Sequence, residues 1–127
     1  MQIWLLVGIG GFIGAIFRYL TSGWIQGSIA TFPVGTLGVN AVGSFLIGLV
    51  MYLSEYSGVF SEETRVMLTL GVLGSFTTMS TFSYESFRLL EQHELLLFGV
   101  NLLLTVLLVL LAVYAGKTCA GYLGAAA

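Results

Sequence analysis

The sequence predicts an all-α membrane protein of four transmembrane helices, and three observations support this: composition, charge spacing and one Gly/Pro break. Hydrophobic residues make up 57% of the 127 residues and charged residues only 8%, whereas a soluble domain has about one quarter charged residues. The charges leave uncharged stretches at 1–17, 19–54, 66–84 and 95–116. A span needs about 20 apolar residues. Since the second stretch contains its own break at Gly27–Pro33, four helices are expected.

The expected spans are residues 3–24, 33–52, 62–90 and 95–116 of a single domain, 1–127. In the first span, Trp4 and Trp24 are separated by about 30 Å of helix, which places one tryptophan near each membrane interface. Gly10 and Gly14 have the small-residue spacing that lets two membrane helices approach closely.

The remaining helix boundaries follow from local signals. Pro33 suits the first turn of the second helix, and Ser61, followed by two glutamates, is expected to cap the third. The polar turn 92–94 precedes the leucine-rich fourth helix, and the C-terminal residues 124–127 carry no weight in these predictions. The spans leave no room for a soluble domain, so the function is expected inside the bilayer.

Positive charge does not select one orientation of the chain. Arg65 and Lys117 fall on one side of the membrane, and Arg18 and Arg88 fall toward the other. Because the lysine and arginine bias of short loops sets orientation, an unbiased chain can insert both ways. Two opposite copies can then form an antiparallel, dual-topology homodimer. A weak bias that this count misses is the alternative.

The third span contains an unusual density of hydroxyl groups. Residues 75–83 read S-F-T-T-M-S-T-F-S, so six of nine residues carry hydroxyls, directly after Gly71 and Gly74. An interrupted helix is tolerated in lipid only where it is buried or lines a cavity, and its freed carbonyls can bind a cation. The segment therefore indicates a broken third helix beside an ion pathway. A continuous helix, bent by hydroxyls that bond the preceding turn, is the alternative.

Polar residues recur at helical spacing in the second and fourth spans, as Thr36, Asn40, Ser44 and as Asn101, Thr105. Each set lies on one helix face. Amide and hydroxyl groups can donate hydrogen bonds to a dehydrated anion without adding a full charge. These stripes are expected to line a pore, and hydrogen bonding between helices is the alternative.

Three further side chains, Phe82, Arg18 and Glu85, allow electrostatic interpretations. Phe82 can turn its positive ring edge toward an anion or simply pack. Arg18 can raise the potential of a vestibule or extend to the interface. Glu85 is either a functional intramembrane carboxylate or the partner of Arg88 one turn away. The sequence contains no catalytic set, phosphate loop or cluster of metal-binding side chains, so the chain is not expected to be an enzyme.

Three segments in order resemble the CrcB-type fluoride channels, also called Fluc: G-G-F-I-G-A-I-F-R-Y at 10–19, G-T-L-G-V-N at 35–40 and G-S-F-T-T-M-S-T-F-S at 74–83. The resemblance implies a passive fluoride-selective channel that exports fluoride across the plasma or inner membrane. It implies an antiparallel homodimer with two pores and a central structural sodium ion (Na+) held by the carbonyls of Gly74 and Thr77. Expected partners are fluoride, the bilayer and a second copy, and no nucleic acid.

The resemblance also assigns a pore lining. It makes Asn40 a pore donor and Phe82 a fluoride-facing ring, and the other expected pore residues are Met79, Ser80, Thr81, Asn101 and Thr105. Two residues depart from the family pattern. Met79 stands where phenylalanine is usual and has no ring edge, and Ser75 stands at a usual glycine. A small dual-topology exporter of cationic drugs is the alternative function, but the first span lacks the carboxylate that such exporters use.

Overall fold

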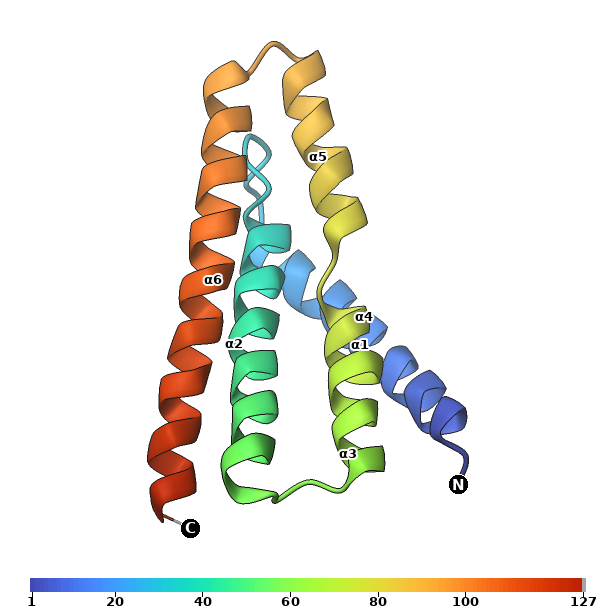
Figure 1. Cartoon of the computed structure of the whole chain (residues 1–127). Coiled ribbons are helices and arrows are strands. Elements are labelled where there is room, and N and C mark those ends of the chain that lie inside the picture. Colours follow the sequence, from blue (N-terminus) through green and yellow to red (C-terminus); the bar gives the residue numbers. More distant parts are fainter. Residues whose placement is uncertain (127) are drawn as a thin grey trace.

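The computed structural model describes residues 1–126, in which four helical segments are long and apolar enough to cross a membrane (Figure 1). Ala127, the last residue of the predicted domain, lies outside the described residues. In chain order the segments are α1 Ile3–Gln26, α2 Val34–Ser57, a composite span Glu62–Glu91 and α6 Leu95–Ala126. Both ends of the chain lie at the same end of the molecule, as an even number of spans requires (Figure 1).

The composite third span consists of four pieces: α3 Glu62–Val66, the π-helix η1 Met67–Leu73, α4 Gly74–Phe76 and α5 Met79–Glu91. The Ser61 side chain accepts a hydrogen bond from the Thr64 N–H, which confirms the predicted cap. Thr77 (φ −85°, ψ 156°) and Thr78 (φ −149°, ψ 118°) are extended. The hydroxyl-rich segment therefore departs from helical geometry at only two residues.

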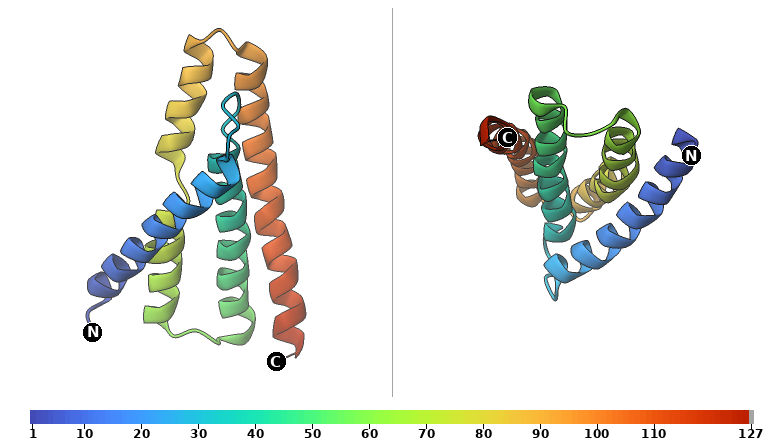
Figure 2. Two further views of the ribbon diagram at one scale, coloured as in Figure 1. Left: turned by 180° about the vertical axis from the view of Figure 1, so that it is seen from behind. Right: turned by 90° about the horizontal axis from the view of Figure 1, so that it is seen from below.

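Helix α1 crosses the lower half of the third span obliquely (Figures 1 and 2). A Cβ atom added at Gly14 would lie 2.1 Å from the Val72 carbonyl oxygen, and one at Gly10 would lie 2.8 Å from that of Met67. The two backbones thus touch at positions where any side chain would collide. This confirms the close approach predicted from the glycine spacing.

Helices α2 and α6 run side by side in the same direction, and α5 lies beside the other half of α6 (Figures 1 and 2). Helix α6 has 32 residues, roughly 48 Å of helix, so it outlasts the predicted end at residue 116. The charge of Lys117 marked that end, but its ammonium lies 5.0 Å from the centre of the Tyr52 ring on α2. Contact with α2 therefore continues beyond the first charge.

A single copy buries few large apolar side chains and leaves most of them on its surface. Val39 and Asn101 are its largest fully buried side chains, whereas Trp4 is 67% exposed and Trp24 81% exposed. Apolar surface of this extent would oppose solubility in water. It instead suits a chain whose outer faces contact lipid or another copy.

Candidate ion pathway at the interrupted third span

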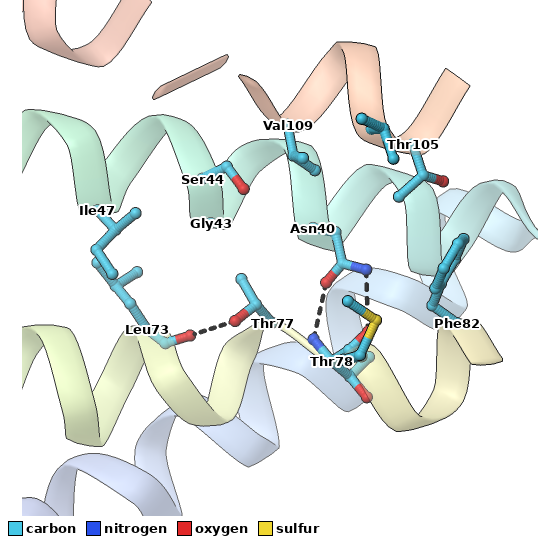
Figure 3. Close-up of a pocket in the computed structure, with 12 residues that line it drawn as sticks. Asn40, Gly43, Ser44, Ile47, Leu73, Thr77, Thr78, Phe82, Thr105 and Val109 are labelled. Atoms are coloured by element: carbon cyan, nitrogen blue, oxygen red, sulfur yellow. Dashed lines mark hydrogen bonds between the residues drawn. The ribbon is translucent and has the colours of Figure 1, made fainter. Parts of the chain in front are cut away.

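The side chain of Asn40 on α2 satisfies the backbone where the third span is interrupted. Asn40 Nδ2 donates to the Thr78 carbonyl at 3.0 Å, and the Thr78 N–H donates to Asn40 Oδ1 at 2.7 Å (Figure 3). Asn40 is buried. This pair of bonds allows two extended residues to exist at membrane depth, where water cannot replace the lost helical partners. A primary amide has two N–H donors, so one remains beyond the bond to Thr78.

Thr78 also begins the second half of the span. Its Oγ1 accepts from the Thr81 N–H at 3.2 Å as the N-cap of α5. In a continuous α-helix, the Thr78 N–H would bond the Gly74 carbonyl and the Thr81 N–H would bond the Thr77 carbonyl. Both donors are diverted here. The carbonyls of Gly74 and Thr77, the two predicted cation ligands, have therefore lost their helical partners.

A cavity of about 360 Å³, the central groove, lies between α2, the interruption, α5 and α6 (Figure 3). Its polar lining comes from α2, the interruption and α6, whereas α5 contributes apolar side chains. Gly43 on α2 lies where a Cβ would come within 2.2 Å of the Thr77 side chain, so this glycine lets the interruption approach α2. The lining includes Asn40, Ser44, Thr77, Thr78, Met79, Phe82 and Thr105.

The structure brings four of the predicted pore residues together and places three elsewhere. Asn40, Met79, Phe82 and Thr105 all line the central groove. Asn101 is 2% exposed and lies behind Thr105. The other two, Ser80 and Thr81, are on other faces of α5.

Thr81 instead lines a separate cavity of about 210 Å³, the Arg18 pocket, with Arg18, Thr36 and Thr78. Ser80 is exposed, with its Oγ 3.4 Å from Thr78 Oγ1. Thr78 lines both the central groove and the Arg18 pocket. The interruption therefore forms the wall between the two cavities, and Arg18 lies on the far side of that wall from Phe82.

Glu85 faces the chain interior through a contact with α2. Its carboxylate accepts a hydrogen bond from the Thr36 hydroxyl, and it lines a third cavity of about 170 Å³ together with Gln26 and Arg88. The alternative pairing of Glu85 with Arg88 is wrong, because Arg88 pairs with Glu91 at 3.1 Å.

The predicted stripe of Thr36, Asn40 and Ser44 divides between cavities. Asn40 and Ser44 line the central groove, whereas Thr36 lines the Arg18 pocket. Four residues advance a helix by about 40° more than a full turn. Eight residues therefore turn the side-chain direction far enough to separate the ends of such a stripe.

Two residues of the site, Thr78 and Ser86, were not singled out in the sequence. Thr78 carries an N-cap signal, a threonine immediately before a helix, which could have located the start of α5. Ser86 is buried and accepts a hydrogen bond from Asn101 Nδ2 at 2.9 Å. Its position four residues after Phe82, on the same helix face, is the signal that could have found it.

Comparison with known proteins places these features in a family. Residues 5–117 match the family described as CrcB-like protein, Camphor Resistance (CrcB). This chain belongs to the CrcB family. The family resemblance read from the three sequence segments is thereby confirmed.

Similar CrcB-family proteins carry channel names. The chain is 65% identical over 116 residues to fluoride-specific ion channel FluC 1 of Methanosarcina acetivorans, with 91% of this chain and 88% of the relative covered. It is 61% identical to FluC 3 of Methanosarcina barkeri over the same shares. It is 48% identical to FluC of Geotalea daltonii, with 97% of this chain and 100% of the relative covered. These relatives are named as channels, which confirms the expectation that the chain is not an enzyme.

Proposed function

We propose that the chain is a passive, fluoride-selective ion channel of the plasma or inner membrane. The observation that carries the proposal is the central groove, in which neutral hydrogen-bond donors line a cavity at the interrupted span of a CrcB-family protein. Fluoride is proposed as the ion because the similar CrcB-family proteins are named fluoride-specific ion channels. The groove supplies groups that suit it, because fluoride is a small anion that accepts strong hydrogen bonds.

The donors of the groove can replace water around an anion. Asn40 has one N–H beyond its bond to Thr78, and Ser44 and Thr105 each carry a hydroxyl. The ring edge of Phe82 adds a region of positive potential. Since none of these groups is charged, an anion is held without a deep electrostatic trap. Weak binding of this kind allows an ion to enter and also to leave.

The proposed assembly is an antiparallel homodimer with two pores, one along each central groove. The four basic residues are divided equally between the two sides of the membrane, which favours insertion in both orientations. Gly74 is exposed on a single copy, so a second copy can cover the freed carbonyls. Carbonyl oxygens are hard ligands suited to a cation such as sodium. Gly74 and Thr77 of each copy would hold a structural Na+ that joins the subunits.

A passive channel moves fluoride down its own gradient, and export follows whenever fluoride is more concentrated inside the cell. The test is ion efflux from liposomes that contain the purified protein and are loaded with potassium fluoride or potassium chloride. We expect fluoride efflux and chloride retention. Chloride efflux at a comparable rate, or proton-coupled export of a cationic dye without fluoride efflux, would exclude the proposed function.

The sodium site requires its own measurement. We expect fluoride efflux in sodium-containing buffer, and a loss of efflux after purification and reconstitution without sodium. Equal efflux in both preparations would remove sodium from the proposal and leave the fluoride channel intact.

A further inference from the structure

A buried chain of hydrogen bonds lies immediately behind the central groove and joins α5 to α6. Asn101 Nδ2 donates to Ser86 Oγ at 2.9 Å, and Thr105 Oγ1 donates to Asn101 Oδ1 at 3.5 Å. Ser86 is 4% exposed, Asn101 2% and Thr105 7%. Thr105 lines the groove. The chain therefore connects a groove hydroxyl to a serine on the opposite helix through one amide.

The direction of these bonds matters for an anion. With the Thr105 proton directed at Asn101, the hydroxyl presents only lone pairs to the groove, and lone pairs repel an anion. The bond that holds this proton is weak, because 3.5 Å exceeds the usual range of about 2.5–3.0 Å for a hydroxyl donor. The Thr105 hydroxyl is therefore held only weakly in the orientation that directs its proton toward Asn101 and away from the groove.

The same three residues can form the chain in the opposite direction. The two ends of an amide are of nearly equal size, one accepting and the other donating, and a serine hydroxyl can do either. If the Asn101 amide turns by half a rotation, Ser86 donates to Oδ1 and Nδ2 donates to Thr105 Oγ1. The Thr105 proton is then free to point into the groove. The Asn101 amide is bonded at both ends in either direction, which a buried amide requires.

We propose that Ser86 is a positioning residue that sets the orientation of the Asn101 amide, and through it the polarity that Thr105 presents to the groove. An anion in the groove selects the orientation in which Asn101 Nδ2 faces Thr105. The inference rests on the proposed function, because fluoride is the anion that makes the selection. It adds a residue that neither lines the groove nor touches the ion.

Ser86 suits this role because its hydroxyl serves both orientations. Alanine at this position leaves one end of the buried amide without a partner in either direction. Threonine keeps the hydroxyl, so it is the matched control. A residue that only held the two helices together would also be disturbed by alanine, and the test therefore needs a readout of the amide itself.

The first measurement is fluoride efflux from liposomes that contain the wild type, Ser86→Ala or Ser86→Thr. Loss of one buried hydrogen-bond partner is expected to slow efflux about fivefold in Ser86→Ala. Ser86→Thr is expected to retain most of the wild-type rate. Size-exclusion elution and helical circular dichroism of each variant establish that the compared proteins are folded.

The second measurement uses the asparagine content of the chain. Asn40 and Asn101 are its only asparagines, so 15N labelling of asparagine side chains gives two amide signals by magnetic resonance. The signal displaced in Ser86→Ala without added fluoride belongs to Asn101. In the wild type, this signal is expected to shift when sodium fluoride replaces sodium chloride. The shift should disappear in Thr105→Val, which retains the branched shape and removes the hydroxyl.

The outcomes separate this inference from the proposed function. Fluoride efflux from wild type combined with an unchanged rate in Ser86→Ala would overturn the role of Ser86 and leave the channel intact. An Asn101 signal that ignores fluoride in a conducting wild type, or that still responds in Thr105→Val, would overturn the amide reversal. No fluoride efflux from wild type would overturn the proposed function, and the inference with it.

Discussion

At the scale of single residues, the side-chain amide of Asn40 replaces two backbone hydrogen-bond partners that Thr78 lacks at the interruption. It binds both the N–H and the carbonyl of Thr78, and it still lines the central groove. A buried polar backbone group without a partner is costly, so this side chain stabilises the interruption. The same residue thus has a structural role and, under the proposed function, a role as an anion donor.

Replacing Asn40 with aspartate tests both roles. In Asn40→Asp the carboxylate can still accept from the Thr78 N–H, but it cannot donate to the Thr78 carbonyl or to an anion, and it adds negative charge. We expect fluoride efflux from liposomes to fall by at least about tenfold, since a hydrogen bond to a charged group is worth about 1.5–3 kcal/mol. Gln2→Glu, the same chemical change at an exposed site, is the control. Unchanged efflux in Asn40→Asp would remove Asn40 from the pathway.

Met79 lines the central groove at a position where the family resemblance calls for phenylalanine. In Met79→Phe a second ring edge joins that of Phe82, and its positive rim can face an anion. We expect fluoride efflux equal to or faster than that of wild type in the liposome assay. Met79→Leu, which has no ring, is the control and should not gain. A clear loss in Met79→Phe, with the protein still folded, would contradict the placement of Met79 at the pore.

At the scale of elements, the sequence predicts helices well and their irregularities poorly. Charge spacing predicted four spans and Ser61 was correctly predicted as a cap, because burial in lipid and capping are local effects, whereas the predicted end of the fourth span falls short of the end of α6. The π-helix Met67–Leu73 was not expected. It lies against the glycines of α1, and no periodicity within the third span reveals a contact with another helix.

The sequence predicted which residues belong to the candidate site better than it predicted which way each side chain points. Asn40, Phe82 and Thr105 meet in one groove as the family resemblance implied, whereas Thr81 lies on the other side of the interruption. Two extended residues reset the rotation of α5 relative to α4. Which face of α5 meets the groove depends on these backbone angles, and the sequence does not state them.

The contact between α1 and η1 gives a prediction about stability. In Gly14→Ala the new methyl group would lie 2.1 Å from the Val72 carbonyl oxygen, so one backbone must move. Overpacking of this kind costs about 1–3 kcal/mol. We expect Gly14→Ala to unfold at a lower temperature in detergent, followed by circular dichroism.

The control for Gly14→Ala lies on the same helix. A Cβ at Gly23 meets nothing within 4 Å, and alanine is a better helix former than glycine by about 1 kcal/mol. Gly23→Ala should therefore unfold at an equal or higher temperature than wild type. Equal thermal stability of the two variants would show that α1 and η1 do not touch at Gly14 in the detergent-solubilised protein.

At the scale of the whole molecule, orientation can be measured with a residue that the chain already contains. Cys119 is its only cysteine and is exposed, two residues after Lys117 on α6. It reports the side of the membrane on which both chain ends lie (Figure 1). If both orientations form, a membrane-impermeant maleimide should label about half of the Cys119 thiols on intact cells, given the even charge count. Labelling of nearly all or nearly none would contradict dual topology.

A pair of charge variants tests whether opposite orientations are needed together. Val59 and Ile29 are exposed loop residues at opposite ends of the molecule, so Val59→Lys and Ile29→Lys each break the even count in opposite directions. An added lysine favours the orientation in which the end of the molecule that carries it lies in the cytoplasm. Maleimide labelling of Cys119 should therefore fall in Val59→Lys and rise in Ile29→Lys.

The proposed pores require one copy of each orientation. Either variant alone should therefore conduct little fluoride after expression in cells, and expression of the two together should restore fluoride conduction. Full fluoride conduction by one variant with a single orientation would exclude the antiparallel dimer, while the labelling result would still stand as a test of topology.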